Sequence, residues 1–545
     1  MRLAPTTFDR VRKEVAAFCP RCHAEELERP LAGVARLPGE LAEAEGAVWL
    51  ARECPRHGRV VTLYEEDAAI LDELERWTAP TKGATPDDGR NDDPPPRSYL
   101  RGLGARQRQH TCVLLEDTTA RCNMRCPTCY AGSSPSTAGV ASVQDILANV
   151  DRRIALEGGR LDVLMLSGGE PTVHPQLFEL LGQTLRRNVV RVLLNTNGVR
   201  LAHDDRLLSF LAEHRDRLEV YLQFDGFRES THRHHRDADL REIKRRTIER
   251  LSDEGVFMTL TMAAERGVNE DEIGEVVRYA LETPFVGGVC VQPVFGSGRT
   301  VGFDPLDRLT MTGVLRHLGP QTGGLVEMRD LIALPCSHPH CTSVGFLVRT
   351  DRGWRSLVSL IGREELHEHL DLVSNRIVDP GIVRQLRTLV GLTLVGLHSE
   401  QSSLTHPTLR HMFLRAVGDG GLGLGSLLRM AATYARDRGR LRALMGERVK
   451  RVTVKGFMDI HTMVEDRLLR CCVHTGAMTD GGPVAMPFCA AQTWPALGAM
   501  KVASAQAVVA EAARSRPSSR IEISRIRNFW IFPVTVIGNS ATTRT

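Results

Sequence analysis

Residues 121–130 read Arg121-Cys-Asn-Met-Arg-Cys-Pro-Thr-Cys-Tyr130, and they place Cys122, Cys126 and Cys129 in the spacing C-x3-C-x2-C. Thiolates are ligands of zinc and of iron–sulfur clusters. A structural zinc site needs four ligands, whereas this loop offers three and no local fourth. Three thiolates can hold three irons of a [4Fe–4S] cube and leave the fourth iron open to a substrate. We therefore predict such a cluster; the alternative is a zinc loop or a group of unligated thiols.

This spacing, followed by the aromatic Tyr130, resembles the signature of the radical S-adenosylmethionine (SAM) superfamily. The resemblance implies that the open iron binds the amino and carboxylate groups of SAM. It also implies that the reduced cluster passes one electron to the sulfonium, which yields a 5′-deoxyadenosyl radical that abstracts hydrogen from carbon. Cys122, Cys126 and Cys129 would then form the catalytic centre of an enzyme.

Length and composition describe a large globular protein. The chain has 545 residues, 42% hydrophobic and 25% charged, with a net charge of +4. This length predicts two to four domains, and the small net charge gives no indication of nucleic acid as a partner. We find no apolar run that could span a membrane and no signal peptide, so we expect a cytoplasmic protein. In such a protein, the 13 cysteines indicate metal sites rather than disulfides.

Two short cysteine motifs near the N-terminus predict a small metal module. They are Cys19-Pro-Arg-Cys-His23 and Cys54-Pro-Arg-His-Gly58, with short strands expected at 47–50 and 60–64. The pattern resembles a zinc-ribbon or rubredoxin-like module that holds Zn or Fe. Metal binding supplies folding energy where a core is thin, so we expect a structural role. The predicted ligands are Cys19, Cys22 and Cys54, with His57, His23 or Cys112 as the fourth.

The middle of the chain alternates between strand and helix patterns. This alternation predicts parallel βα units, and six of them suit the partial (β/α)6 barrel that the resemblance implies, an α/β fold. The expected strands are 113–117, 162–167, 192–196, 218–224, 256–262 and 288–292, and the expected helices are 143–157, one from about 175, 205–213, 240–254 and 270–282. The predicted organisation is a metal module at 1–78, a linker at 79–100, the barrel at 101–310, an auxiliary iron–sulfur region at 311–500 and a tail at 501–545.

Several motifs follow the predicted strands, at the edge where parallel barrels collect their sites. Gly168-Gly-Glu-Pro171 resembles the motif whose backbone and glutamate receive the SAM amino group. Each motif alone is also ordinary turn or strand-end chemistry. The resemblance implies a set of cofactor-binding residues: Tyr130, Gly168, Gly169, Glu170, Asn195, Asn197, Gln223, Asp225 and Gln292.

Two further features of the barrel sequence have plain structural interpretations. Residues 231–236, Thr-His-Arg-His-His-Arg, lack paired ligand spacing and are interpreted as a solvated loop or a rim near the substrate. Cys290 lies in an apolar strand and is interpreted as a core thiol.

The C-terminal half contains a second set of cysteines in loops that bear proline and histidine. We predict that Cys336, Cys341, Cys489 and one of Cys471 or Cys472 hold an auxiliary [4Fe–4S] cluster. The alternative is a zinc site or buried free thiols. The leucine-rich stretch 392–430 could line an apolar tunnel or belong to a core.

Several segments resemble one radical SAM subfamily, that of the tetraether lipid synthase and the dihydro-hydroxymethylpterin methyltransferase-like proteins. They are 109–112, 222–226, 334–341, 457–459, 472–474 and 487–489. The resemblance implies functionalisation or coupling of an unactivated C–H carbon, such as that of a lipid chain. Relatives carry a further cysteine-rich stretch before Gln109, which here is absent, so one metal centre of the family is missing or rebuilt.

Two alternatives remain open at this stage. One is radical methylation or maturation of a pterin, peptide or other small substrate. The other is a non-catalytic iron–sulfur scaffold, against which the intact Glu170 and the three-thiol spacing argue. Both enzyme hypotheses imply a transferase with a one-electron donor such as ferredoxin or flavodoxin, and the lipid hypothesis implies lipid biosynthesis at or near a membrane surface.

Overall fold

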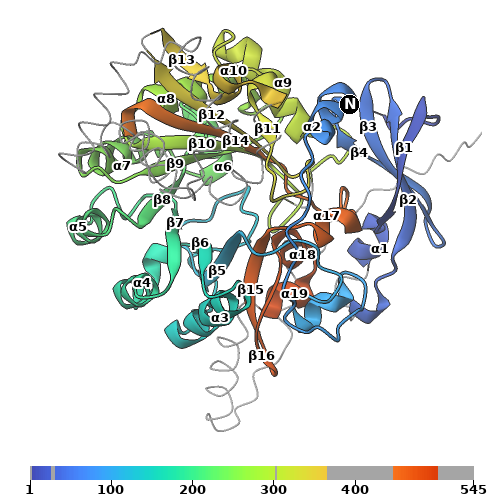
Figure 1. Ribbon diagram of the computed structural model, residues 1–545, viewed down its shortest axis with the longest axis horizontal. Helices are drawn as coiled ribbons and strands as arrows, with labels where there is room; N and C mark the ends of the chain where they lie inside the picture. The colour runs from blue at the N-terminus through green and yellow to red at the C-terminus, as the bar shows by residue number, and fades with distance from the viewer. Residues whose placement is uncertain (1–2, 26–30, 301–302, 351, 365–445, 501–545) are drawn as a thin grey trace, which may run out of the picture. The chain divides into compact units, whose positions relative to one another are not determined.

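The computed structural model describes residues 3–25, 31–300, 303–350, 352–364 and 446–500. The leucine-rich stretch 392–430 and the predicted tail 501–545 lie outside these residues. The described strands form two sheets, a small antiparallel one near the N-terminus and a large mixed one (Figure 1).

The N-terminal sheet is a four-stranded antiparallel meander in the order β1-β2-β3-β4. Helix α1 (Pro20–Glu25) lies between the first two strands, and α2 (Ala68–Arg76) follows the last, with its N-terminus capped by Asp67. The predicted strands at 47–50 and 60–64 are confirmed and extended. The strands are β1 (Arg10–Ala17), β2 (Leu37–Ala44), β3 (Ala47–Cys54) and β4 (Gly58–Glu65).

The centre of the large sheet is six parallel strands that pair in chain order, as the βα pattern predicted. Alternate side chains face the two sides of each strand, so one set lines the barrel interior and the other packs under the helices. The strands are β5 (Val113–Thr119), β6 (Leu161–Gly168), β7 (Val189–Thr196), β8 (Leu218–Gln223), β9 (Met258–Ala264) and β10 (Val286–Pro293).

Helices cover the outer face of this sheet (Figure 1). Their buried leucine, isoleucine and valine side chains form one continuous core with the outward-facing strand residues. They are α3 (Val143–Leu156), α4 (Leu177–Leu185), α5 (Asp205–Glu213), α7 (Arg241–Asp253), α8 (Ile273–Glu282) and α9 (Met311–Thr322); the short α6 (Glu229–Arg236) follows β8.

Strands from the C-terminal half extend the barrel sheet at both of its edges. β14 (Val449–Lys455) runs parallel to β10, and β15 (Val473–Thr479) runs parallel to β5. Antiparallel strands β12 (Thr342–Thr350) and β16 (Gly482–Pro487) lie outside them. The remaining described elements are β11 (Ile332–Ala333), β13 (Gly353–Ser356), α10 (Leu357–Ile361), α17 (Glu465–Leu469), α18 (Phe488–Thr493) and α19 (Pro495–Met500).

The segment predicted as a linker has little regular structure but is packed into the fold. Tyr99 and Leu103 are buried in a core that includes C-terminal residues. Asp87 accepts hydrogen bonds from the backbone N–H of Leu103 (2.9 Å) and of Ala485 (3.0 Å), and it pairs with Arg153 (2.7 Å). The segment therefore joins the N-terminal module to the barrel as a fixed strap.

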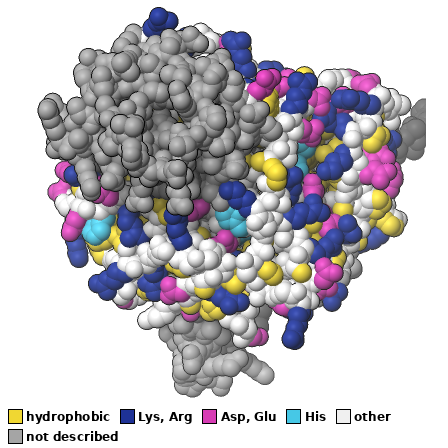
Figure 2. Space-filling view, viewed as in Figure 1, with side chains coloured by type: hydrophobic (Ala, Val, Ile, Leu, Met, Phe, Trp, Pro, Cys, Tyr) yellow, Lys and Arg dark blue, Asp and Glu magenta, His cyan; other side chains and the backbone are white. Residues whose placement is uncertain are grey.

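The surface carries charges of both signs. Figure 2 shows lysine and arginine side chains mixed with aspartate and glutamate over the described part of one face, in keeping with the small net charge. Within the described ranges, we find no helix with the length and apolar character needed to cross a membrane.

Candidate active site

The three predicted cluster ligands lie in the loop after β5. Cys122 and Cys126 are buried, Cys129 is half-buried, and all three line a cavity of about 310 Å³. Within the loop, Cys122 N donates to Ser134 O (3.1 Å) and Cys129 N donates to Cys126 O (3.3 Å). Burial raises the pKa of the Cys122 thiol to about 12. The positive charge of a bound metal would therefore be needed to keep this thiol ionised.

Arg299 clamps this loop, and the sequence analysis did not predict it as a site residue. Its Nε donates to Cys126 O (2.6 Å), a terminal nitrogen donates to Ser133 O (2.8 Å), and its backbone N donates to Cys129 O (3.0 Å). The preceding Gly298 has a φ of +59°, and a Cβ there would lie 2.3 Å from Cys129 O. The Gly-Arg pair after β10 was the only sequence signal for this clamp.

The two glycines after β6 let the cluster loop approach the strand end. A Cβ on Gly169 would lie 2.2 Å from Arg121 O, and one on Gly168 would lie 2.4 Å from Thr119 O. Backbone atoms occupy the space that a side chain would need, and Gly169 N donates a hydrogen bond to Thr119 O at 2.6 Å. These positions therefore require glycine for steric reasons.

Glu170 is buried and organises the next strand end. Oε1 accepts from Thr172 Oγ1 (2.7 Å) and Thr196 Oγ1 (2.7 Å), and Oε2 accepts from Asn197 N (2.8 Å). Asn197 in turn donates to Asn123 Oδ1 in the cluster loop (2.7 Å). The carboxylate thus ties three strand-end segments together beside the predicted SAM position.

A chain of polar side chains crosses the carboxyl ends of the barrel strands. Asn195 Nδ2 donates to Ser167 Oγ (2.9 Å), and Gln223 Nε2 donates to Asn195 Oδ1 (2.9 Å). Arg236 donates to Gln223 Oε1 (3.2 Å) and binds both oxygens of Asp225 (2.6 and 2.7 Å). The chain fixes the orientation of each amide, so the cavity presents a defined pattern of donors and acceptors.

The ion pair of Arg236 and Asp225 lies at the end of this chain. Burial alone would raise the pKa of Asp225, but the guanidinium of Arg236 holds it well below its usual range. Lys244 is also buried here and donates to Asn197 O (2.5 Å), and its burial lowers its pKa to about 8. These cations face the cluster loop, where they would offset the negative charge of metal-bound thiolates.

Of the two interpretations of residues 231–236, the solvated loop is wrong, whereas a position at the rim of the cavity agrees with the structure. They belong to α6, in which Thr231, His232 and His235 are buried. His235 Nδ1 lies 3.0 Å from Thr128 Oγ1 of the cluster loop, and Arg236 reaches the cavity. A helix turn explains this arrangement, since positions three and four residues apart share a face.

The cavity wall combines aromatic and polar side chains. The Tyr130 ring stacks on Phe295 with centroids 6.1 Å apart, and burial raises its pKa. Gln292 Nε2 donates to Tyr221 Oη (3.0 Å) and lies 3.5 Å from Cys290 Sγ. Cys290 is buried, as a core thiol would be, but it lines the cavity rather than the outer core.

The structure brings nearly all predicted cofactor-binding residues to this one cavity. Asp225 is the exception, because it does not line the cavity and reaches it only through Arg236. The lining residues from the predicted set are Tyr130, Gly168, Gly169, Glu170, Asn195, Asn197, Gln223 and Gln292.

The C-terminal cysteines group differently from the predicted auxiliary set. Cys336 and Cys472 form a compact group with Cys112, in which the two sulfurs of Cys336 and Cys472 are 3.8 Å apart. Hydrogen bonds with Cys112 and Cys472 hold the pKa of the Cys336 thiol well below its ordinary value. Cys341 and Cys489, predicted to join Cys336, are not in this compact group.

Cys341, Cys471 and Cys489 form a looser second set on the same cavity. Cys341 Sγ accepts from Arg467 Nε (3.3 Å), and Cys489 Sγ accepts from Met458 N (3.4 Å). Burial raises the pKa of Cys471 well above its ordinary value, and the charges of Cys472, Cys489 and Cys341 raise it further. Topology explains the regrouping, because β15 pairs with β5 and sets Cys472 beside Cys112.

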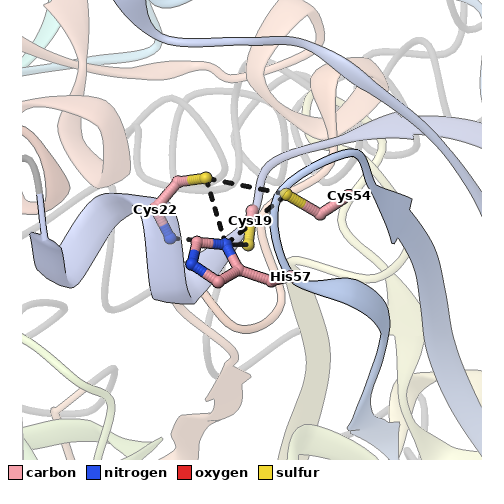
Figure 3. A group of neighbouring side chains, drawn as sticks. All are labelled: Cys19, Cys22, Cys54 and His57. Atoms are coloured by element: carbon pink, nitrogen blue, oxygen red, sulfur yellow. Dashed lines mark hydrogen bonds between the residues drawn. The ribbon is translucent and has the colours of Figure 1, made fainter.

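The N-terminal module assembles a four-ligand group. Figure 3 shows Cys19, Cys22, Cys54 and His57 converging on one position. Cys19 directly precedes α1 and Cys22 lies on it, whereas Cys54 ends β3 and His57 lies in the β3–β4 turn. His57 Nδ1 lies 3.4–3.5 Å from the three sulfurs, and its Nε2 lies 3.0 Å from Glu25 Oε1. A carboxylate behind a ligating histidine is the usual support of a metal site.

His57 therefore takes the fourth position in this module. Of the other two candidates, Cys112 lies in the cavity group, and His23 is not part of the four-ligand group. His23 is instead half-buried, and this burial lowers its pKa to about 4.

Comparison with known families agrees with both regions. Residues 117–280 match the radical SAM superfamily, and residues 11–66 match the HMPTM N-terminal zinc ribbon domain. The chain belongs to the radical SAM superfamily. The first match contains the cluster loop, Glu170 and Arg236, and the second contains all four ligands of the N-terminal group.

Two curated proteins resemble this radical SAM enzyme. The 7,8-dihydro-6-hydroxymethylpterin dimethyltransferase of Methanocaldococcus jannaschii is 24% identical over 516 residues, which cover 89% of this chain and 94% of that protein. The subtilosin biosynthesis protein AlbA of Bacillus subtilis is 25% identical over 250 residues, 44% of this chain and 51% of AlbA. Among solved structures, SuiB of Streptococcus suis with bound S-adenosylmethionine aligns at 12% identity and a TM-score of 0.32, over 38% of this chain and 46% of SuiB. The chain thus spans less than half the length of SuiB.

Proposed function

We propose that this radical SAM enzyme methylates or otherwise alkylates a small polar heterocycle of the pterin class. The observation that carries the proposal is the full-length similarity to a pterin dimethyltransferase, together with one cavity that gathers the cluster loop and the predicted SAM residues. When bound, the cluster and SAM would supply a 5′-deoxyadenosyl radical that abstracts hydrogen from the carbon to be modified, and the methyl or alkyl group would come from a second molecule of SAM or another one-carbon donor.

The residues of the chain suit the cluster and SAM. The loop provides three cysteines with a cavity beside them, and Arg299, Gly168 and Gly169 hold the loop against the barrel. In this proposal Glu170 and Asn197 orient the SAM amino acid portion. Gln223, Asn195 and Gln292 then provide amide donors and acceptors to the remainder of SAM or to the substrate.

The floor of the cavity supports a polar substrate. Glu219 and Tyr221 line it on β8, nearer to the start of the strand than Gln223, and Arg451 lines it on β14. A pterin ring offers hydrogen-bonding nitrogens and oxygens that such groups can pair with. Each of the three groups has a protein partner, Arg191, Gln292 and Thr259 respectively, and an alkyl chain would make no use of their remaining hydrogen-bonding capacity.

A lipid chain is the second candidate substrate. The observation that favours it is the aromatic wall of Tyr130, Phe295, Phe457 and Phe488, which contact one another along one side of the cavity. Coupling or functionalisation of a lipid carbon therefore stays a prediction. The scaffold hypothesis has no such support, since the chain belongs to an enzyme family and retains the site residues described above.

Metal content forms part of the proposal. We assign Zn²⁺ to Cys19, Cys22, Cys54 and His57, because these four ligands are closed around one position. We assign an auxiliary iron–sulfur cluster to Cys341, Cys471 and Cys489, because the sulfurs of Cys341 and Cys489 accept N–H hydrogen bonds of the kind that tune clusters and all three thiols line one cavity. Reduction by a ferredoxin or flavodoxin and a cytoplasmic location also remain predictions.

The decisive experiment measures SAM cleavage by anaerobically reconstituted protein with a chemical reductant. We expect wild type to release 5′-deoxyadenosine and Cys126→Ala to fall to the background rate, because the cube loses one of its three thiolates. Arg125→Ala, an exposed change in the same loop, is the matched control and should retain cleavage. Equal cleavage by wild type and Cys126→Ala would refute the proposed centre.

Substrate class is tested in the same assay. 7,8-Dihydro-6-hydroxymethylpterin and a saturated isoprenoid lipid are added separately, and products are examined by mass spectrometry. A methylated or alkylated pterin supports the first candidate. A modified lipid with an unmodified pterin would replace it with the second.

A further inference from the structure

Cys112, Cys336 and Cys472 form a built group, although they come from distant parts of the chain. Cys112 precedes β5, Cys336 follows β11, and Cys472 precedes β15. Cys112 N donates to Cys472 O (2.9 Å), and Gln109 Nε2 donates to Cys336 O (2.9 Å), so backbone contacts hold the three segments together. All three side chains are buried, with exposed fractions of 9%, 5% and 3%.

The spacing of the sulfurs matches ligands of one ion. In a tetrahedral site with a metal–sulfur bond of about 2.3 Å, neighbouring sulfurs are about 3.8 Å apart. The sulfurs of Cys336 and Cys472 are 3.8 Å apart, and all three lie within 4.8 Å of one another. The N-terminal group shows the same scale, with 3.6 Å between the sulfurs of Cys22 and Cys54.

A [4Fe–4S] cube requires a different spacing. Each of its thiolates binds a different iron at a corner of the cube, so the sulfurs must lie farther apart than the ligands of a single ion. Over the part of the chain that the structure describes, neither the cluster loop nor the set of Cys341, Cys471 and Cys489 forms a group within 4.8 Å. The compact set thus differs in kind from both.

We propose that Cys112, Cys336 and Cys472 bind a single divalent ion of the zinc class, separate from the SAM cluster, and leave its fourth position open to the cavity. The ion has three protein ligands, the arrangement of catalytic rather than structural zinc sites. The three cysteines line the same cavity as Cys122 and Glu170. The open position therefore takes a nitrogen or sulfur donor from a molecule bound in that cavity.

His110 lies beside Cys112 but is not part of the compact group. Its Nε2 is 3.5 Å from Cys112 Sγ, and its Nδ1 is 3.2 Å from Glu157 Oε2. In this position it orients Cys112 from behind. The metal site does not depend on the proposed methylation, so the two are tested separately.

Metal analysis of the full-length protein tests the ion. Protein purified without oxygen is measured for zinc, iron and acid-labile sulfide, with Cys472→Ala, Cys336→Ser and the control Cys290→Ala. We expect about two zinc-class ions per chain in wild type and in the control, and about one in each triad variant. Iron and sulfide should stay equal in all four, which also shows that the variants fold.

Two results would overturn the site. A triad variant that loses about four irons with their sulfide, at unchanged zinc, would assign these cysteines to a cube. Unchanged zinc, iron and sulfide in both triad variants would mean that these thiols hold no metal.

Cobalt substitution tests the open position. Wild-type protein and Cys472→Ala are loaded with Co²⁺, and imidazole or 2-mercaptoethanol is added as the probe. We expect the probe to shift the visible bands of wild type only, because the N-terminal group already supplies four ligands. An unshifted wild type, or a shift that occurs only in His110→Ala, would show that the fourth position is closed.

Discussion

The N-terminal module and the barrel both use cysteines, but their sites are organised by different forces. In the module, four ligands converge from two short segments, and the cluster packed around their sulfurs is small, formed by Cys19, Leu37, Cys54 and Val60. The other side of the module's sheet packs in a core that it shares with C-terminal segments. In the barrel, three cysteines occupy a loop that rests on an extensive core of strand and helix residues.

The difference is that between a metal site that stabilises its domain and a metal site that an already stable domain holds for chemistry. A closed four-ligand site leaves no position for a substrate, so its binding energy appears as folding energy. A three-ligand loop on an independently packed barrel can leave a position open for chemistry. Substitutions that remove a metal ligand or a contact of the packed barrel should therefore affect the two regions differently.

Removal of a module ligand should have the largest effect. Cys22→Ala breaks the four-ligand group, and structural zinc contributes on the order of 10 kcal/mol in small zinc domains. We expect the variant to lose its zinc and its protection from proteolysis within residues 10–65. Limited proteolysis with mass spectrometry measures this, with His23→Gln as the matched control that keeps the zinc.

The barrel should respond in the opposite way to metal loss. Chelation of zinc should leave the SAM cluster's iron and the cooperative thermal transition of the barrel in place. A barrel that unfolds together with the module on chelation would erase the proposed difference between the two regions.

The ion pair behind the cavity should have the next largest effect. Arg236→Met leaves the carboxylate of Asp225, which is fully buried, without its partner, a change that typically costs about 3–5 kcal/mol. We expect a clear drop in the midpoint of thermal unfolding and weaker SAM binding. Addition of Asp225→Asn should recover much of the stability but not the SAM binding. Equal stability of wild type and Arg236→Met would show that this pair does not support the barrel.

The loop clamp should have a smaller and more local effect. Arg299→Lys keeps the charge but loses the fork that reaches Cys126 O and Ser133 O together. Charged hydrogen bonds contribute about 1.5–3 kcal/mol each. We expect faster loss of cluster absorbance in the presence of a chelator, with an unchanged unfolding midpoint. A cluster as durable as that of wild type would contradict the clamp.

Local patterns carried most of what the sequence could predict. The cluster loop, the Gly-Gly-Glu-Pro turn and the module cysteines were found because their chemistry lies within a few residues along the chain. The strand order followed for the same reason, since consecutive βα units pair in sequence. Asn195 and Gln292 were then expected at strand ends, and Tyr130 at the end of the cluster loop.

Long-range topology accounts for what the sequence could not show. Val473 pairs with Val113, which sets Cys472 beside Cys112, and no spacing along the chain signals that neighbour. The wrong interpretation of residues 231–236 as a solvated loop has a related cause, since a run of polar residues gives no sign that one face is buried against β8 and the cluster loop. The role of Arg236 could be recognised only from the structure, which shows its ion pair with Asp225.

A buried lysine in the barrel gives the smallest and most specific prediction. Lys450 Nζ donates to Thr283 O (2.6 Å), Val286 O (2.8 Å) and Gly446 O (2.8 Å), and burial lowers its pKa to about 8. An unfolded lysine has a pKa of about 10.4. Between these values the unfolded chain binds more protons, so the free energy of unfolding should rise as the pH increases from about 8 to about 10.

Lys450→Met should reduce this rise in stability but not abolish it, because the buried Lys244, whose pKa is also about 8, contributes over the same range. Lys13→Met, a change at an exposed lysine far from the barrel strands, should keep the wild-type slope. Thermal unfolding midpoints in a pH series measure the effect, after zinc has been held constant so that the module does not contribute. If the free energy of unfolding instead fell over this range in both wild type and Lys450→Met, the buried charge of Lys450 would not destabilise the barrel. The pH dependence of unfolding would then have to come from the metal-binding module. That result would contradict the distinction between a barrel stabilised by packing and a module stabilised by metal.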